Sequence, residues 1–588
     1  MGTVCNGSVN TMIESDVLVI GGGLGGCRAA LRAKDFTQNV VLVDKGIVGR
    51  TGNTIPCHII LAPTPQESLD DWVRESVEFS EYTANETWFK TLFCEQPKRL
   101  RELEEWGVTF IKDSQGNLLS ERCRGMMEAC KSAVFGERFW MDHVRKQLIS
   151  QGVKLVPRIM ITELLTSDGE YPTSGRVTGA VGFNIVDGQC FIFKARAVVI
   201  ATGPISSVIH ARSSNMTGDG HAMAFRAGAE ITNMEFASMV NFMAMLKPPS
   251  NVLIRSLAQF QNHGAHFINA LGERFIGNYF PNRMEQGSGF THLGLACARE
   301  ILDGHGPLFF DMRHWSHDME QMMRRSAPEM MAILDKAGIN ILKQPVEFKL
   351  IVDWFSPHGN GGIDSTIDGE TSIPGLFASG VSANAGAGEV FAGVAQAACN
   401  VFGYRAGESA GQEALKRQEA TISHTSIRQL FQDIKAPLRR DTNISATQVY
   451  HAIASKTLPH RYSLYKHKLR IMEALAELDR IEVEMLPRVS AADPHGLVKA
   501  NTVRNYLQVS RLSQLASLER KESRSHHYRE DYPYRDDINW LKWLIFKQGS
   551  GKITVRTDPI PIDQYQHFPR DRVMVPAQVC FSTQDPTA

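Results

Sequence analysis

Short apolar runs that end at glycines dominate the start of the chain. Residues 16–20 (Asp-Val-Leu-Val-Ile) form one such run, and residues 39–43 form a second. Continuous apolar, β-branched runs of this length are typical of buried parallel strands. Between them, residues 23–34 are rich in Ala, Leu and Arg, which favours a helix. The order strand, glycine turn, helix, strand predicts one βαβ unit.

The hydrophobic pattern changes several times further along. Residues 78–105 are helical and amphipathic, and residues 153–200 contain short strands that lead into a last buried strand over 197–203. Residues 236–345 have few clear strands and are interpreted as an inserted mixed domain. Strand and glycine signals return over 346–415, and a helical region follows. From these changes we expect units at 1–235, 236–345, 346–415 and 416–545, and a Pro-rich, extended tail at 546–588.

Composition narrows the class of protein. The 588 residues suggest about four domain-sized units, and 43% hydrophobic with 21% charged residues excludes wholesale disorder. Lys plus Arg and Asp plus Glu are both 63, so no net basic field exists to attract nucleic acid. With no apolar run of about 18 residues and no signal-like N-terminus, we expect a cytoplasmic protein without a membrane span. The ten cysteines form no C-x-x-C pair, so we expect no metal centre in this chain.

The first glycine turn carries the strongest candidate chemistry. Gly21, Gly23 and Gly26 form a G-x-G-x-x-G between a strand and a helix. The first glycine permits the tight turn, the second lets backbone approach a pyrophosphate, and the third lets helix and strand pack closely. The helix N-terminus favours phosphate, and Asp44 at the end of the second strand suits ribose hydroxyls. This context predicts a dinucleotide site but does not separate NAD from FAD.

Further motifs add a family resemblance. In order they are Ala201-Thr-Gly203, Thr217-Gly-Asp-Gly220, Gly272-Glu-Arg-Phe275, Pro374-Gly-Leu-Phe377, Phe402-Gly-Tyr-Arg-Ala-Gly407, Glu522-Ser-Arg524, Arg529-Glu-Asp-Tyr-Pro533 and Arg535-Asp-Asp537. With the glycine motif they span residues 16 to about 543. The chain resembles flavoprotein subunits of the fumarate reductase/succinate dehydrogenase superfamily, which also holds L-aspartate oxidase and the adenylylsulfate reductase α subunit.

The resemblance implies an α/β fold. It comprises a Rossmann-like FAD-binding domain in two parts (1–235 and 346–415), an inserted α+β capping domain (236–345), a helical domain and the extended tail. It implies FAD rather than NAD. Residues carried over as cofactor-binding are Gly21, Gly23, Gly26, Asp44 and Lys45 for the adenosine half and pyrophosphate, Thr51, Gly52, Asn53 and Thr54 near the ring, and Thr202, Gly203, Asp219 and Gly380. Several relatives attach FAD through a His where this chain has Arg50-Thr-Gly-Asn-Thr54, so we expect non-covalent FAD.

The resemblance fails at the substrate site. Val240 stands near a family His, His292 stands where a proton-delivering Arg-Asp pair is expected, Glu389-Val-Phe-Ala-Gly-Val-Ala395 lacks a carboxylate-binding Arg, and the His of Pro357-His-Gly-Asn-Gly-Gly362 is shifted by one. An enoate reduction needs such groups because negative charge builds up as hydride arrives. Val381 also replaces a Glu that many relatives place after Gly380. We therefore expect a substrate that is not a C4-dicarboxylate.

Three residues are candidates to replace the missing groups. His292 could act as a general acid near neutral pH, His358 adjoins a turn that faces the flavin in relatives, and Arg283 could bind an anion. Each could instead be an ordinary loop or core residue. His263, His266, Arg524 and His527 are interpreted as structural, and the methionines at 234, 239, 243 and 245 as core.

We therefore expect an FAD-dependent oxidoreductase subunit that exchanges electrons with a separate iron–sulfur protein, a partner that the resemblance implies. Alternatives are an adenylylsulfate-reductase-like enzyme, a fumarate reductase or succinate dehydrogenase proper, and an electron-transfer subunit without its own substrate. The neutral charge argues against an RNA-modifying FAD protein. The sequence leaves the substrate, the direction, the partner's identity and the oligomeric state open.

Overall fold

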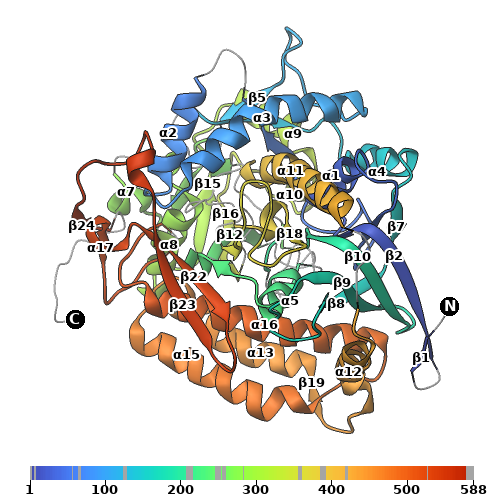
Figure 1. The fold of residues 1–588 in the computed structure, drawn as a ribbon. Coiled ribbons are helices and arrows are strands. Elements are labelled where there is room, and N and C mark those ends of the chain that lie inside the picture. Colours follow the sequence, from blue (N-terminus) through green and yellow to red (C-terminus); the bar gives the residue numbers. More distant parts are fainter. Residues whose placement is uncertain are drawn as a thin grey trace.

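A mixed sheet forms the centre of the computed structural model (Figure 1). Its strands lie in the order β7-β3-β2-β10-β9-β8, and β18 also pairs with β10. The mutually parallel strands are β2 (Ser8–Ile20), β3 (Val40–Val43), β7 (Lys154–Val156), β10 (Cys190–Ile200) and β18 (Leu376–Ala378). Antiparallel to this group or to each other are β9 (Val177–Asn184) and β8 (Ile159–Thr166). The Rossmann-like sheet expected from the sequence is thereby confirmed.

The structure describes residues 3–5, 8–55, 57–63, 68–122, 129–206, 216–236, 238–245, 253–254, 260–261, 263–281, 284–354, 361–384, 393–417, 422–525 and 527–577.

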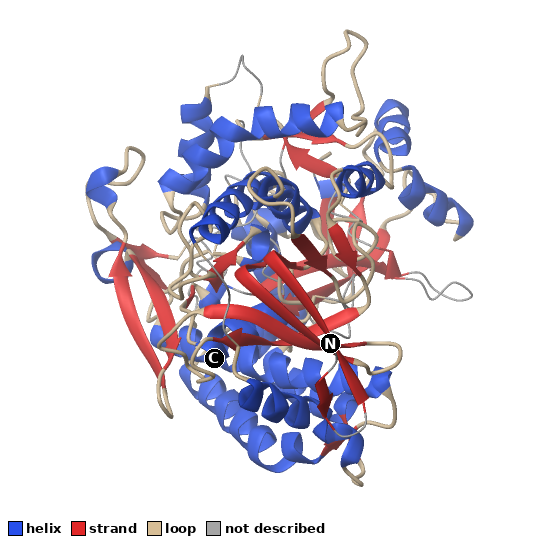
Figure 2. Cartoon of the chain, turned by 45° about the vertical axis from the view of Figure 1, so that its right-hand side comes forward, coloured by secondary structure: helices blue, strands red, loops and turns tan. Residues whose placement is uncertain are grey.

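Two helices that are far apart in the sequence pack closely against each other beside the central sheet. Helix α1 (Leu24–Ala33) follows the glycine turn, and α11 (Val394–Lys416) comes some 370 residues later. A Cβ at Gly403 would lie 2.6 Å from the carbonyl oxygen of Gly25, and one at Gly407 would lie 2.3 Å from that of Ala29. No Cβ atom can approach an oxygen this closely, so residues 403 and 407 must be glycines for α1 and α11 to pack as they do. Figure 2 shows helices on both sides of the central strands.

The helix expected over 78–105 is interrupted near its start, and only its part from residue 86 onward is one continuous helix. Helix α2 (Leu69–Phe79) ends before a turn, and α3 (Glu86–Glu105) begins after it. Glu81 and Tyr82 in this turn have φ of 50° and 66°, the left-handed region that side chains adopt rarely. A three-stranded sheet lies nearby along the chain, with β4 (Ile59–Leu61) and β5 (Ser120–Arg122) on either side of β6 (Lys131–Val134), and helix α4 (Met141–Ser150) follows.

The cap contains more strand structure than its sequence suggests. Its sheet has the order β13-β12-β16-β15-β14. The strands are β12 (Ser238–Met245), β13 (Leu253–Ile254), β14 (His266–Ile268), β15 (Leu308–Asp311) and β16 (Val346–Trp354). Its helices include α7 (Ile276–Tyr279), α8 (Phe290–Leu302), α9 (His317–Ser326) and α10 (Pro328–Lys336). Strand β16, which follows the boundary expected at residue 345, pairs with β12 and β15 of this sheet.

The helical region forms the layer at the bottom of Figure 1. It contains α12 (His424–Lys435), α13 (Ala446–Thr457), α15 (Lys468–Arg480) and α16 (Pro494–Glu519). Helix α16 packs against α5 (Asp219–Ala227) and buries polar as well as apolar side chains, including Asn501, Asn505 and Gln514. The interface between the helical region and the FAD-binding part of the chain therefore contains buried polar side chains.

The segment after residue 545 does not begin as an extended tail. Strands β22 (Lys542–Gln548) and β23 (Ile553–Pro559) form a hairpin, and β22 pairs with β11 (Ile231–Thr232), which pairs in turn with β17 (Gly362–Ile363). Strand β24 (Met574–Pro576) pairs with β21 (Tyr534–Asp536). Pro559, Pro561 and Pro569 therefore delimit a hairpin and a loop, and residues 578–588 lie outside the described part. Among the described residues, no helix is long and apolar enough to cross a membrane.

Candidate cofactor cleft

A long cleft opens beyond the carboxyl ends of the parallel strands β2, β3 and β10. It encloses about 900 Å³, part of which is open solvent. In open α/β sheets ligands bind at this edge. Eleven of the thirteen expected cofactor residues line it: Gly21, Gly23, Asp44, Lys45, Thr51, Gly52, Asn53, Thr54, Thr202, Gly203 and Asp219. Segments from far apart in the sequence thus meet in one binding surface.

The glycine turn has no room for side chains at two points. Gly21 has φ of 113°, and a Cβ there would lie 2.3 Å from the carbonyl oxygen of Ala201. A Cβ at Gly26 would lie 1.8 Å from the carbonyl oxygen of Gly21. Gly23 caps α1 and has no side chain to bond the first turn. The Leu24 N–H donates to the Thr54 hydroxyl at 3.3 Å, and the N–H groups that follow it in the first turn have no partner within the helix. The turn therefore brings bare backbone and a helix N-terminus to the cleft, as a pyrophosphate requires.

Asp44 is held rigidly at the end of β3. Its Oδ2 accepts from the Gly22 N–H at 2.6 Å, and its Oδ1 accepts from the Gly46 N–H at 2.6 Å and from the Thr51 hydroxyl at 3.1 Å. These donors fix the orientation of the carboxylate. The group is thus placed to accept from ribose hydroxyls.

Lys45 and Asp219 form a second polar element of the wall. Lys45 Nζ donates to Asp219 Oδ2 at 2.7 Å and to the Thr217 hydroxyl at 3.0 Å. Asp219 is the first residue of α5, where the helix dipole favours a negative charge. Its side chain is about one-tenth exposed, so the pair is screened little by solvent.

Three buried polar atoms at the wall have no hydrogen-bond partner among the described residues: Asn53 Oδ1, Ser379 Oγ and Gln396 Oε1. Leaving a buried acceptor or donor unsatisfied costs about 1–3 kcal/mol. Gln396 lies in the first turn of α11, whose cap Gly393 also makes no side-chain hydrogen bond. The wall therefore fits a long ligand with polar groups along its length, and the FAD implied by the resemblance is such a ligand.

The two remaining cofactor residues support the wall without lining it. Gly26 packs on Gly21 as described, and Gly380 has φ of 60° with Cys399 Sγ 2.8 Å from where its Cβ would be. Val381, which stands in place of the family Glu, does line the cleft. Sequence reasoning missed Gln396, Ser379 and Cys399, because nothing in a run of small residues marks them as facing a ligand.

Of the three expected catalytic residues, only His292 lies in the part of the chain that the structure describes. His292 lies on α8 in the cap, 2% exposed, with its ring centroid 5.5 Å from that of Phe280. Arg283 and His358 lie outside the described residues. His266 stacks on His314 with ring centroids 3.8 Å apart, and burial, aided by Arg274, lowers its pKa. Neither His292 nor His266 is among the described residues that line the cleft.

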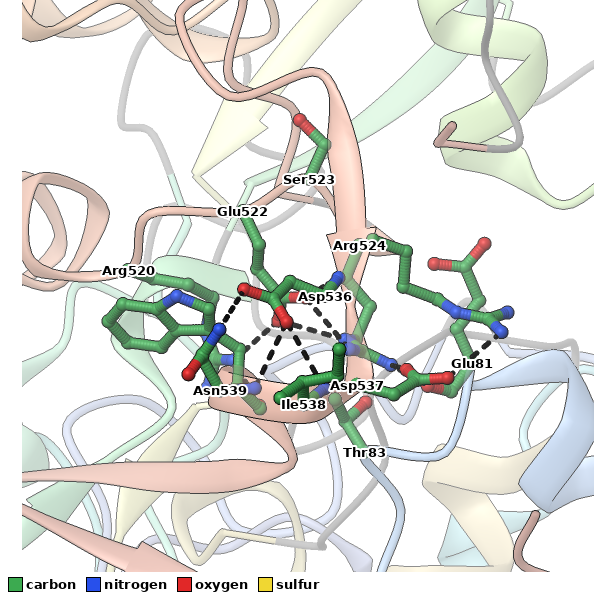
Figure 3. Close-up of polar contacts among 12 residues, drawn as sticks. Glu81, Thr83, Arg520, Glu522, Ser523, Arg524, Asp536, Asp537, Ile538 and Asn539 are labelled. Atoms are coloured by element: carbon green, nitrogen blue, oxygen red, sulfur yellow. Dashed lines mark hydrogen bonds and ion pairs between the residues drawn. The ribbon is translucent and has the colours of Figure 1, made fainter. Parts of the chain in front are cut away.

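A buried charge cluster links the C-terminal region to the start of the cap. We define it as Glu235, Arg520, Glu522, Arg524 and Asp537, whose side chains are all 0% exposed. Figure 3 labels its C-terminal members, Arg520, Glu522, Arg524 and Asp537. Arg520 donates to Glu235 at 2.7 Å and to Glu522 at 2.8 Å. Arg524 donates to Glu522 twice, each time at 2.8 Å. Because Glu235 lies shortly before β12, the cluster fixes the chain where the cap begins.

Arg524 also anchors the left-handed turn between α2 and α3. Its Nη1 donates to the carbonyl oxygen of Glu81 at 2.6 Å, and Figure 3 shows the two residues side by side. Burial lowers the pKa of Arg524, but attraction and hydrogen bonds to Glu522 outweigh it and raise the pKa overall. Burial, followed by the charges of Lys466 and Arg529, holds the pKa of His527 well below its usual value. Neither residue is among those that line the cleft.

Comparison with known proteins gives matches along most of the chain. A family described as FAD binding domain matches residues 16–396, and one described as fumarate reductase flavoprotein C-term matches residues 451–574. A protein of Methanothermobacter marburgensis, named as a subunit of a fumarate reductase (CoM/CoB), is 28% identical over 89% of this chain and 95% of its own length.

Two solved structures have the same fold. A mutant of the E. coli quinol fumarate reductase FrdA aligns with a TM-score of 0.81 at 20% identity, over 95% of this chain and 99% of that one. An adenosine-5-phosphosulfate reductase in complex with sulfite aligns with a TM-score of 0.78 at 20% identity, over 94% and 96%. At this level of identity the two structures establish the fold alone.

Proposed function

Because this chain belongs to the FAD-binding flavoproteins of the fumarate reductase/succinate dehydrogenase superfamily, we propose that it holds FAD non-covalently and oxidises or reduces an organic substrate other than a C4-dicarboxylate. The chain is an FAD-dependent oxidoreductase of that superfamily; the mode of attachment and the substrate class are the proposal. When bound, FAD supplies reversible hydride and electron transfer.

The lining of the cleft carries the proposal of non-covalent binding. Thr51 to Thr54, which stand where several relatives have a linking His, all line the cleft, and no described lining residue is a histidine. Non-covalent contacts alone would then retain the FAD. Backbone at Gly21 and Gly23 and the N-terminus of α1 suit the phosphates, Asp44 suits a ribose, and the unpaired atoms of Asn53, Ser379 and Gln396 offer further hydrogen bonds.

The substrate class is argued from the groups that are missing. A C4-dicarboxylate needs several cations and donors. The sequence has Val240 near the position of a His in relatives, and its Glu389-Val-Phe-Ala-Gly-Val-Ala395 stretch lacks their carboxylate-binding Arg. The acid candidate His292 is 2% exposed in the cap. A site with fewer cations favours a substrate with less negative charge.

Fumarate reduction is the second candidate. It is favoured by the match to a relative named a fumarate reductase across 95% of that relative's length. An adenylylsulfate-reductase-like reaction has only the shared fold in its favour. A subunit that carries electrons without a substrate of its own is consistent with the same missing groups.

An iron–sulfur partner is a further part of the proposal. Relatives are named as subunits, and the ten cysteines here contain no C-x-x-C pair. We expect a second protein to co-purify at native expression level, with iron and acid-labile sulfide in the complex. A flavoprotein that purifies alone and turns over its substrate with no iron present would contradict this part.

Two measurements test the main proposal. Acid precipitation should release the flavin into the supernatant; yellow colour that stays in the pellet would show a covalent bond. The anaerobically reduced protein is then mixed with fumarate, aryl enoates, enones and adenylyl sulfate while flavin absorbance is followed. Rapid reoxidation by an aryl enoate or enone, but not by fumarate, is the expected result. Reoxidation by fumarate alone would overturn the substrate class in favour of the second candidate.

A further inference from the structure

A residue of the helical region touches the acid of the cofactor cleft. Asn505, on α16, donates from Nδ2 to Asp219 Oδ1 at 2.8 Å. The other oxygen of Asp219 accepts from Lys45 Nζ at 2.7 Å and from the Thr217 hydroxyl at 3.0 Å. Asn505 is 2% exposed and Asp219 7%, so water competes little for these bonds.

The orientation of the Asn505 amide is fixed by its two partners. Its Oδ1 accepts from Arg226 Nη1 at 2.9 Å. Arg226 can only donate and the Asp219 carboxylate can only accept, so one orientation of the amide satisfies both. Arg226 is itself held by Glu163 at 2.9 Å and by Gln508 at 2.8 Å. Asn505 therefore joins a fixed cation to the carboxylate that faces the cleft.

We propose that Asn505 is a positioning residue for cofactor binding, which acts through Asp219. This inference rests on the proposed function, since it concerns FAD that is held without a covalent bond. Lys45 restrains one oxygen of Asp219 and Asn505 restrains the other, so both oxygens keep a set direction. Without the amide, Oδ1 loses its donor and the carboxylate rotates toward Lys45 or recruits water. FAD retention thus depends on a helix that lies outside the region matched as an FAD binding domain, residues 16–396.

Two substitutions at one position separate positioning from general support. Asn505→Ala removes both hydrogen bonds. Asn505→Asp keeps the acceptor for Arg226 but replaces the donor to Asp219 with a second carboxylate. The matched control is Gln508→Ala on the same helix, because it removes an equivalent bond to Arg226 and leaves Asp219 untouched.

The experiment titrates apoprotein with FAD and follows quenching of flavin fluorescence, with thermal unfolding of each apoprotein measured alongside. Losing a hydrogen bond to a charged group predicts an FAD dissociation constant about tenfold or more higher for Asn505→Ala. Asn505→Asp should be at least as weak. Gln508→Ala should stay within about threefold of the parent, although its apoprotein also loses thermal stability.

Three results would overturn the inference: Asn505→Ala within about threefold of the parent, recovery of affinity in Asn505→Asp, or equal weakening in Gln508→Ala. These outcomes are distinct from failure of the proposed function. If the parent apoprotein takes up no FAD, or if its flavin is covalently attached, the proposed function itself is wrong.

Discussion

Replacing Glu522 with Gln tests how much the buried charge cluster stabilises the fold. The carboxylate accepts from Arg520, twice from Arg524, and from the Asp536 N–H at 2.9 Å. Gln keeps the shape but has one acceptor oxygen, and its amide places donors against a guanidinium. The change also removes the charge that Arg520 and Arg524 share.

The expected cost follows from the partners that remain. Breaking a fully buried ion pair costs about 3–5 kcal/mol. Arg520 still has Glu235, and Arg524 still lies 2.9 Å from Asp537, so we expect the lower end, about 3 kcal/mol. With about 2.1 cal/mol/K of unfolding entropy per residue, 588 residues give about 1.2 kcal/mol/K. The melting temperature should therefore fall by about 2–3 °C if the chain unfolds as one unit.

Scanning calorimetry of the FAD-loaded protein measures this shift. The matched control is Glu530→Gln in the same motif, whose side chain is 37% exposed and pairs with Arg470 at the surface. An exposed pair is worth about 0–1 kcal/mol, so the control should move by less than about 1 °C. Equal shifts in the two variants would refute the argument that burial makes Glu522 indispensable.

Two further predictions concern the cleft and the pH dependence of stability. Gly26→Ala places a Cβ 1.8 Å from the Gly21 carbonyl oxygen, so the purified variant should contain little FAD. The ratio of flavin to protein absorbance measures this content. A full content of flavin would show that the glycine turn can change its conformation to accommodate the methyl group. Burial, followed by Glu230, raises the pKa of Asp364 from 3.8 to about 6. The folded state thus holds this proton more tightly than the unfolded chain, and the free energy of unfolding should fall as pH rises from 3.8 to about 6. Asp364→Asn should flatten this slope in urea titrations, and an unchanged slope would count against the assignment.

The sequence predicts the cleft well wherever its signals are local. Gly21, Gly26 and Asp44 can be identified because a βαβ turn imposes fixed spacings on residues that are close in the chain. The start of β2 escapes prediction because residues 8–15 are mostly polar. Residues 8–10 form a strand by pairing with β1 (Thr3–Cys5), and residues 11–15 do so by pairing with β10. The sheet that residues 346–354 join is hard to predict for a similar reason, since their apolar pattern does not indicate that they pair with β12.

Side chains that act through long-range pairs are the hardest to predict. Asn505 is one of several polar residues in a long helix, and its partner Asp219 lies 286 positions away. Glu522 and Arg524 belong to a motif that the resemblance identifies, but their burial depends on three segments meeting. His292 shows the opposite case, because a titratable residue near an expected site lies in the interior of the cap.

The pairing of β11 with the hairpin β22–β23 has a consequence for how the protein is made. The Thr232 hydroxyl donates to the carbonyl oxygen of Leu544, 312 positions later. At about 5–20 residues per second, the ribosome needs roughly 15–60 s to deliver that partner. Until then β11 has an open edge, and α16, which carries Asn505, emerges only shortly before. The β11 edge is therefore completed only after Leu544 has been made, so shorter nascent chains in the cell should be apoprotein that a chaperone can still bind.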